Sequence, residues 1–211
     1  MIEQHATPEL VRERYGWAEV DPSDPVIAGQ TGTWRITYYA GAQGIDDGGV
    51  IKFAWRDVSD WAYPQFEDPA APAYATVITN GPASLRARFE KWRYIRPWRL
   101  CVTVDVYDDS LREGDTITLT LGDRSLGSEG SRAQTYCQDV FEFRVAVDWC
   151  GTWTYTEVSS PQFPIVSGPP AKIVVIGPSL TTLDAPAWCG IKVEDAWGNA
   201  CRDYAGEVRI E

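Results

Sequence analysis

The segment of this sequence with the most binding chemistry combines aromatic and arginine side chains. The run Trp92-Arg93-Tyr94-Ile95-Arg96-Pro97-Trp98-Arg99 interleaves aromatic rings with guanidinium groups. Exposed aromatic and arginine residues are typical of interface hot spots, and aromatic rings also stack on sugar rings. Such rings could cap a hydrophobic core, contact a neighbouring domain or bind a carbohydrate. We take Trp92, Arg96 and Trp98 as candidate interface or ligand residues.

A polar loop between two predicted strands is the second place of interest. Residues 122–132 contain glycines and arginines that could cradle an anion. The glycine patterns of phosphate-binding and dinucleotide-binding loops are missing from its surroundings. Loops of this length in compact domains are usually functional or mobile. We expect the loop to fold over its own domain or dock on a neighbour, with anion binding as the alternative. The candidates here are Asp123, Arg124, Arg132 and Gln134.

No catalytic or metal-binding constellation is recognisable in the sequence. The single histidine, His5, falls in a predicted terminal arm, where nothing rigid would hold a base against a nucleophile. One histidine and no four-cysteine spacing argue against zinc. Asp46-Asp47 precedes Gly48-Gly49, which is better explained as a turn than as a calcium loop. We therefore predict no catalytic residue, metal or cofactor in this chain.

Composition indicates that strands position these residues. Of 211 residues, 44% are hydrophobic and 12% aromatic, beside 18 Gly and 14 Pro. Aromatic and β-branched side chains fit a pleated, half-buried surface. The net charge of −11 disfavours nucleic acid and membrane surfaces as partners.

The sequence shows neither an apolar run of about 20 residues nor a basic and then apolar leader. Its five cysteines are an odd number without CxxC spacing, which favours a reducing compartment. These features predict a cytoplasmic protein.

Apolar residues alternate with polar ones at 34–38, 102–106, 117–121 and 141–147, which predicts half-buried strands there. Two further strands are predicted at 50–55 and 74–79. Such strands, bounded by turns, favour an antiparallel, immunoglobulin-like sandwich. After a Gly-Pro-Pro linker at 168–170, only three further short strands are predicted, at 173–176, 189–194 and 207–210. The fold class is therefore all-β: residues 1–30 form an arm with a short helix, 31–167 a sandwich, and 168–211 the start of a second, incomplete immunoglobulin-like sandwich.

Several motifs resemble one bacterial family. They lie in order along residues 30–211: Gly44–Gly49, Ser59-Asp60-Trp61, Pro64–Pro72, Ile95–Trp98, Gly122–Ser125, Arg132–Thr135 and Gly168-Pro169-Pro170. The sequence is similar there to a domain-of-unknown-function family of long proteins. In that family an N-terminal β-sandwich region precedes a catalytic part resembling the polymerase-and-histidinol-phosphatase (PHP) metallohydrolases. The turn Asp195-x-Trp197-Gly198-Asn199 is also similar to one in bacterial immunoglobulin-like repeats.

The resemblance implies that this chain is the N-terminal, non-catalytic portion, with the metal ligands of the family farther downstream. We expect an accessory module that packs against and positions a downstream metallohydrolase-type domain of the same protein. The alternative is a carbohydrate-binding module whose exposed aromatic rings contact a glycan.

Overall fold

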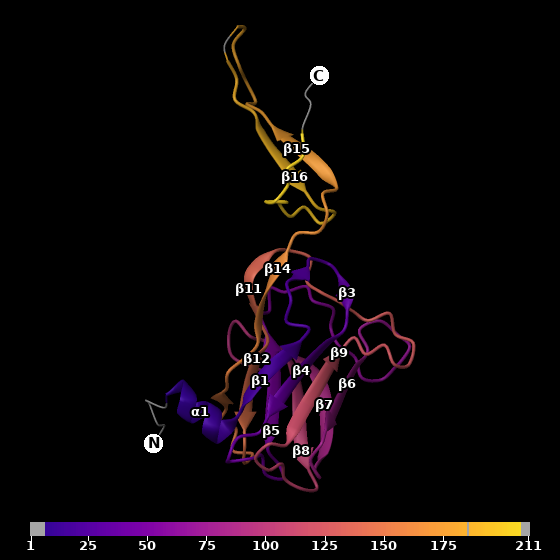
Figure 1. Cartoon of the computed structure of the whole chain (residues 1–211), viewed down its shortest axis with the longest axis vertical. Helices are drawn as coiled ribbons and strands as arrows, with labels where there is room; N and C mark the ends of the chain where they lie inside the picture. The colour runs from indigo at the N-terminus through magenta and orange to yellow at the C-terminus, as the bar shows by residue number, and fades with distance from the viewer. Residues whose placement is uncertain (1–6, 185, 208–211) are drawn as a thin grey trace.

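The computed structural model describes residues 7–184 and 186–207, and its regular secondary structure is almost entirely strand (Figure 1). Its one helix, α1 (Pro8–Tyr15), begins where the Thr7 hydroxyl accepts a hydrogen bond from Leu10 N, with proline in the first turn. The helix ends at Gly16, whose φ of 95° suits glycine. His5, and with it the predicted arm up to residue 6, lies outside the described residues.

Two antiparallel sheets form the main body. One has the order β1-β4-β9-β6 and the other β13-β12-β5-β8-β7. The strands of the first are β1 (Trp17–Asp21), β4 (Trp34–Tyr39), β9 (Thr116–Leu121) and β6 (Ala75–Thr79). Those of the second are β13 (Thr156–Glu157), β12 (Arg144–Asp148), β5 (Val50–Trp55), β8 (Leu100–Tyr107) and β7 (Ser84–Lys91). The all-β sandwich expected from the sequence is confirmed.

Smaller pairings close one end of this body. β11 (Gln138–Glu142) pairs with β14 (Gln162–Val166), which also pairs in parallel with β2 (Val26–Ile27). β3 (Thr31–Gly32) pairs with β10 (Ser131–Arg132). Because β1 and β2 both belong to sheets, the part of the expected arm from residue 17 onward is built into the sandwich.

The core lies between the two large sheets. Ile36 and Tyr38 of β4 face Phe53 of β5 and the valines of β8, all fully buried. Trp61 fills one end, with its ring against those of Phe141, Phe143 and Trp34. Alternate residues of each strand supply this core, which leaves the other residues of β5, β7 and β8 on the outer face of their sheet.

The single strand predicted over 141–147 is wrong. The chain forms two strands there, β11 and β12, in different sheets: Phe141 lies opposite Phe163, whereas Arg144 lies opposite Ala54. Phe143 turns the corner and donates its amide to Pro161 O. The apolar alternation continues across this corner because Phe141 and Phe143 both pack on Trp61.

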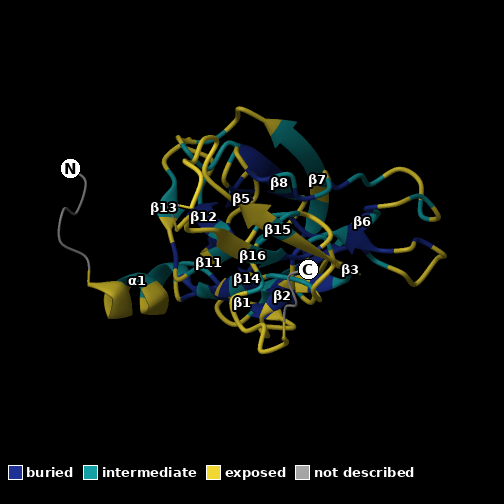
Figure 2. Cartoon of the chain, turned by 90° about the horizontal axis from the view of Figure 1, so that it is seen from above, coloured by how far each residue is buried: buried dark blue, intermediate teal, exposed yellow. Residues whose placement is uncertain are grey.

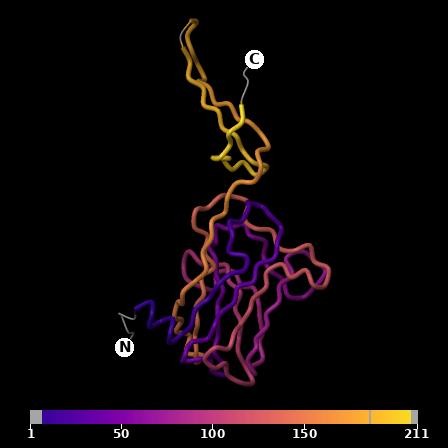
Figure 3. Tube along the Cα trace, in the orientation of Figure 1, coloured from indigo at the N-terminus to yellow at the C-terminus, as the bar shows by residue number. Residues whose placement is uncertain are grey.

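A hairpin follows the sandwich and projects from its end, as the traces in Figures 1 and 3 show. It consists of β15 (Lys172–Ile176) and β16 (Gly190–Glu194), in register from Lys172 opposite Glu194 to Ile176 opposite Gly190. Seen from above, its strands are largely exposed, in contrast to the buried sheets (Figure 2). Of the last strand predicted, at 207–210, only residue 207 is described, so the second sandwich stays a prediction.

Candidate functional site

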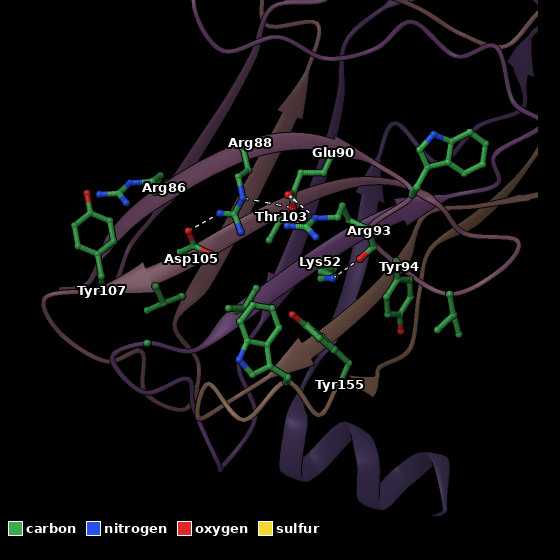
Figure 4. Close-up of a pocket in the computed structure, with 16 residues that line it drawn as sticks. Lys52, Arg86, Arg88, Glu90, Arg93, Tyr94, Thr103, Asp105, Tyr107 and Tyr155 are labelled. Carbon is green, nitrogen blue, oxygen red and sulfur yellow. Dashed lines mark hydrogen bonds and ion pairs between the residues drawn. The ribbon is translucent and has the colours of Figure 1, made fainter.

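A groove of about 720 Å³ lies on the outer face of the five-stranded sheet. Strands β5, β7 and β8 form its floor, and two loops, 92–95 and 153–155, form its walls (Figure 4). The alternation of β8 explains the floor: Val102, Val104 and Val106 enter the core, so Thr103 and Asp105 face outward. The volume of the groove is in the range of small-molecule binding sites.

Charged side chains of β7 and β8 are cross-linked along the floor. Arg88 forms an ion pair with Asp105, and its Nε lies 3.4 Å from Glu90 Oε2. Glu90 also accepts hydrogen bonds from Thr103 Oγ1 at 2.8 Å and from Arg93 Nε at 3.1 Å. Burial alone would raise the pKa of Glu90, but these hydrogen bonds and the two guanidinium charges lower it. Glu90 is thereby held as a carboxylate.

Lys52 is placed differently from these arginines. It is only 7% exposed, and its Nζ donates to Arg93 O at 2.6 Å. The ammonium lies 4.4 Å from the centre of the Tyr155 ring and 5.3 Å from that of Tyr94. Within the described part of the chain, no carboxylate oxygen comes within ion-pair distance of it. Burial lowers the pKa of Lys52.

Two tryptophans stand at the walls of the groove. Trp92 is 62% and Trp153 81% exposed. Both have left-handed backbones, with φ of 66° and 62°, a conformation that costs a bulky residue about 1 kcal/mol or more. Asp148 holds the second of them by accepting hydrogen bonds from Thr152 N and Trp153 N. The fold thus maintains strained backbone at both positions where an exposed indole ring lines the groove.

The three candidates of the 92–99 segment do not form one patch. Trp92 lines the groove, and Arg96 is exposed on the same loop. Trp98 instead is half-buried, with the Arg144 guanidinium 3.3 Å above its ring and that of Arg56 at 5.7 Å. Its ring therefore packs against the sandwich itself.

Asp123 and Arg124 stabilise the 122–130 loop. Asp123 accepts hydrogen bonds from Ser125 N at 2.9 Å and from Thr76 Oγ1 at 2.8 Å. The bond from Ser125 N is the main cause that lowers the pKa of Asp123. Arg124 donates to Thr31 O at 3.2 Å. The loop is thus folded back onto its own sandwich, which fits the first of the two expectations for it.

Arg132 and Gln134 lie near the junction with the C-terminal hairpin. Arg132 donates to Asp60 O at 3.0 Å, and its guanidinium lies 5.7 Å from the centre of the Trp197 ring. Gln134 is fully buried and donates to Tyr136 O and Gln138 Oε1. Arg132 therefore contacts the C-terminal hairpin segment through Trp197, whereas the side chain of Gln134 stabilises the 134–138 segment of the sandwich.

The turn at 195–199 is the centre of that junction. Asp195 accepts four hydrogen bonds of 2.8–2.9 Å, from the amides of Gly168, Trp197 and Asn199 and from Asn199 Nδ2. Asn199 then crosses to the sandwich: it donates to Thr135 O at 2.9 Å and accepts from Cys137 N at 3.0 Å. Gly29 opposite has a φ of 72°, and a Cβ there would lie 2.1 Å from Trp197 Nε1.

Sequence reasoning missed most of the groove, including Lys52, Glu90, Asp105, Trp153 and Tyr155. One feature of the sequence could have indicated the floor of the groove. Along β7, charged residues alternate with apolar ones: Arg86, Arg88 and Glu90 with Leu85, Ala87 and Phe89. This alternation predicts a strand with one fully charged face.

The described residues contain no group of three or more His, Cys, Asp or Glu side chains able to hold a metal ion. They also contain no helix long and apolar enough to cross a membrane.

Comparisons with known proteins give little more. No family model and no curated protein matches the chain. Among solved structures it is similar to the human F-spondin reeler domain, with 12% identity and a TM-score of 0.31, over 78% of this chain and 100% of that one. A likeness at this level carries no argument about function.

Proposed function

We propose that this chain is a non-catalytic accessory module that packs against and positions a following domain of the same polypeptide. The observation that carries the proposal is the apolar surface of the C-terminal hairpin. Trp188 and Leu183 are each 93% exposed in the connection between its strands. Ile173, Val175 and Ile176 of β15 are exposed as well.

Such a hairpin needs a partner. A two-stranded hairpin is marginally stable in water by itself, and clustered exposed apolar side chains mark sites of protein contact. The Asp195 and Asn199 hydrogen bonds fix the base of the hairpin on the sandwich. They would therefore give a domain that packs on the hairpin a defined orientation. That this domain is a metallohydrolase is suggested only by the family resemblance described above.

The test uses the full-length polypeptide that the gene encodes. If Trp188 is an anchor, Trp188→Ala should destabilise the docked state by about 2 kcal/mol or more, seen as a lower denaturant midpoint of the docked domain. Trp153→Ala is the matched control, because that ring is also highly exposed but belongs to the sandwich. Equal midpoints for both variants and the wild type, or a natural polypeptide that ends at Glu211, would refute the proposal.

A carbohydrate-binding module is the second candidate, and the groove on the five-stranded sheet favours it. Exposed indole rings over a polar floor are suited to a sugar, whose C–H faces can stack while its hydroxyl groups are hydrogen-bonded. The expected result is quenching or enhancement of tryptophan fluorescence by a glycan, reduced in Trp153→Ala. A glycan panel that changes no fluorescence and shows no binding heat would exclude this candidate.

A further inference from the structure

We infer that the groove binds an acidic saccharide, with one sugar carboxylate held by Lys52 and another by Arg86. Lys52 on β5 and Arg86 on β7 lie two strands and two register positions apart, so they would hold carboxylates of different sugars in one chain. The inference rests on the second candidate function and specifies its ligand class. Lys52, Arg86, Trp92, Trp153 and the other residues that carry it all line the same groove.

Charge is the first argument. The residues lining the groove include four cationic side chains (Lys52, Arg86, Arg88 and Arg93) and two carboxylates (Glu90 and Asp105), which leaves a surplus of two positive charges. The chain as a whole carries −11. A cationic groove on an acidic protein attracts anions locally, whereas long polyanions such as nucleic acid are repelled by the rest of the surface.

The surplus positive charge of the groove is located at two residues, Lys52 and Arg86. Arg88 and Arg93 are paired with the carboxylates of the floor. For Lys52 and Arg86, the described part of the chain offers no ion-pair partner; Arg86 lies over the Tyr107 ring at 5.2 Å. A ligand carboxylate would therefore meet unpaired cations without displacing an existing ion pair.

Lys52 is built as a receptor for such a group. An ammonium group has three donors, and one of them is used, toward Arg93 O. A nearly buried charge without a direct ion-pair partner is unfavourable. The contacts of Lys52 to Tyr94 and Tyr155 and the charge of nearby Glu90 offset part of that cost. A carboxylate would satisfy the remaining donors and supply the missing charge.

The rings indicate a saccharide and not a small inorganic anion. Trp92 and Trp153 present exposed indoles at the walls, at a cost in backbone strain. The Arg99 guanidinium lies 4.1 Å from the centre of the Trp92 ring, so Trp153 is the ring with more free surface. An inorganic anion would contact the cations and leave these rings unused. A sugar ring that carries a carboxylate uses both features, since its apolar face can stack while the carboxylate reaches the floor.

The experiment titrates the whole chain with a panel of oligosaccharides, four to six sugars long, that cover galacturonate, glucuronate, mannuronate and guluronate. Each is paired with its methyl ester, which keeps the rings and removes the charge, and binding is measured by calorimetry and tryptophan fluorescence. At least one acidic oligosaccharide should bind with an affinity about tenfold or more higher than that of its ester. Added salt should weaken the binding of the acid.

Variants localise the site. Lys52→Met and Arg86→Gln should each weaken binding of that acid about tenfold and leave binding of the ester unchanged; Arg86 is exposed, so its variant should fold normally. Trp153→Ala should weaken the binding of both the acid and its ester. Lys91→Gln is the control, because Lys91 lies over Tyr63, away from the groove.

The outcomes separate the two levels of the claim. Equal binding of acid and ester would overturn the acidic-saccharide inference and leave the carbohydrate module standing. Binding of inorganic sulfate without any glycan would overturn both in favour of a simple anion site. No binding by the whole panel would also overturn both, whereas charge-dependent binding lost in Lys52→Met and Arg86→Gln would establish the inference.

Discussion

Replacing Asp195 by alanine should release the C-terminal hairpin from the sandwich. The Asp195 carboxylate is almost fully buried and accepts four hydrogen bonds, three of them from backbone amides. Deleting it leaves those donors unpaired, at about 1–3 kcal/mol for each buried group. Losing one partner of a buried charged network typically costs about 3–5 kcal/mol. We take the lower end, about 3 kcal/mol, because Trp197 beside it is exposed and water can enter.

Hydrogen exchange measures this loss where it occurs. A cost of about 3 kcal/mol corresponds to a drop of about 100-fold in amide protection, expected across β15 and β16 and at Gly168. Amides of β5 and β8, in the middle of the sandwich, should keep their protection. Asp203→Ala is the control, since Asp203 is an exposed acid in the following turn. Unchanged protection of β15 and β16 in Asp195→Ala would refute the reasoning.

Acid should act on the same network without a mutation. Burial would raise the pKa of Asp195, but hydrogen bonds from Asn199, Gly168 and Trp197 lower it below its ordinary 3.8. A carboxyl group whose pKa is lowered by folding stabilises the folded state above the unfolded pKa. This contribution is lost as the pH falls through the folded value. Protection of the hairpin should therefore decline below about pH 4, and Asp195→Ala should not show that additional decline.

Three further predictions concern the sandwich and the junction. Gly29→Ala should move Trp197 and lower hairpin protection, because the new Cβ would lie 2.1 Å from Trp197 Nε1; exchange indistinguishable from wild type would contradict the contact. Trp98→Ala should lower the free energy of unfolding of the 211-residue chain, measured in urea, by about 2 kcal/mol, because the variant loses both the packing of the ring and the Arg144 contact. Trp92 is exposed, so Trp92→Ala should change the free energy of unfolding by less than about 0.5 kcal/mol. Burial raises the pKa of Cys101 from 9.0 to about 11, so its contribution is complete below pH 9 and is lost toward pH 11, by about 2–3 kcal/mol. In Cys101→Ala the stability should fall less steeply over that range, and an equal slope would contradict the assignment.

The strands that alternate strictly were predictable from the sequence. β4 forms where Trp34, Ile36 and Tyr38 alternate with more polar residues, and the valines of β8 face the core as their spacing requires. The alternation of apolar residues gave a wrong strand where a tertiary contact determines the path of the backbone. The chain turns a corner at Phe143 because Phe141 and Phe143 both pack against Trp61. The local pattern failed likewise for β1, which is short and is defined by its pairing with β4.

The candidate sites show the same division. The sequence identified the aromatic and arginine run at 92–99 and the polar loop at 122–132 as candidate binding segments. It did not show which of their side chains the fold would bring together. Trp98 and Trp92 are close in sequence, yet one packs on Arg144 and the other opens into the groove. Lys52 and Tyr155, far apart in sequence, meet only because β5 and the loop after β12 share one face of a sheet. Such long-range contacts have no local signature.

The most direct test of the proposed accessory role compares the hairpin in two polypeptides. Amide exchange of β15 and β16, and of the 177–189 connection, would be measured in the 211-residue chain and in the full-length polypeptide that the gene encodes. If a following domain packs on the hairpin, protection there should rise by about 30-fold or more, equivalent to about 2 kcal/mol, while β5 and β8 stay unchanged. Equal exchange of the hairpin in both polypeptides would contradict the proposal.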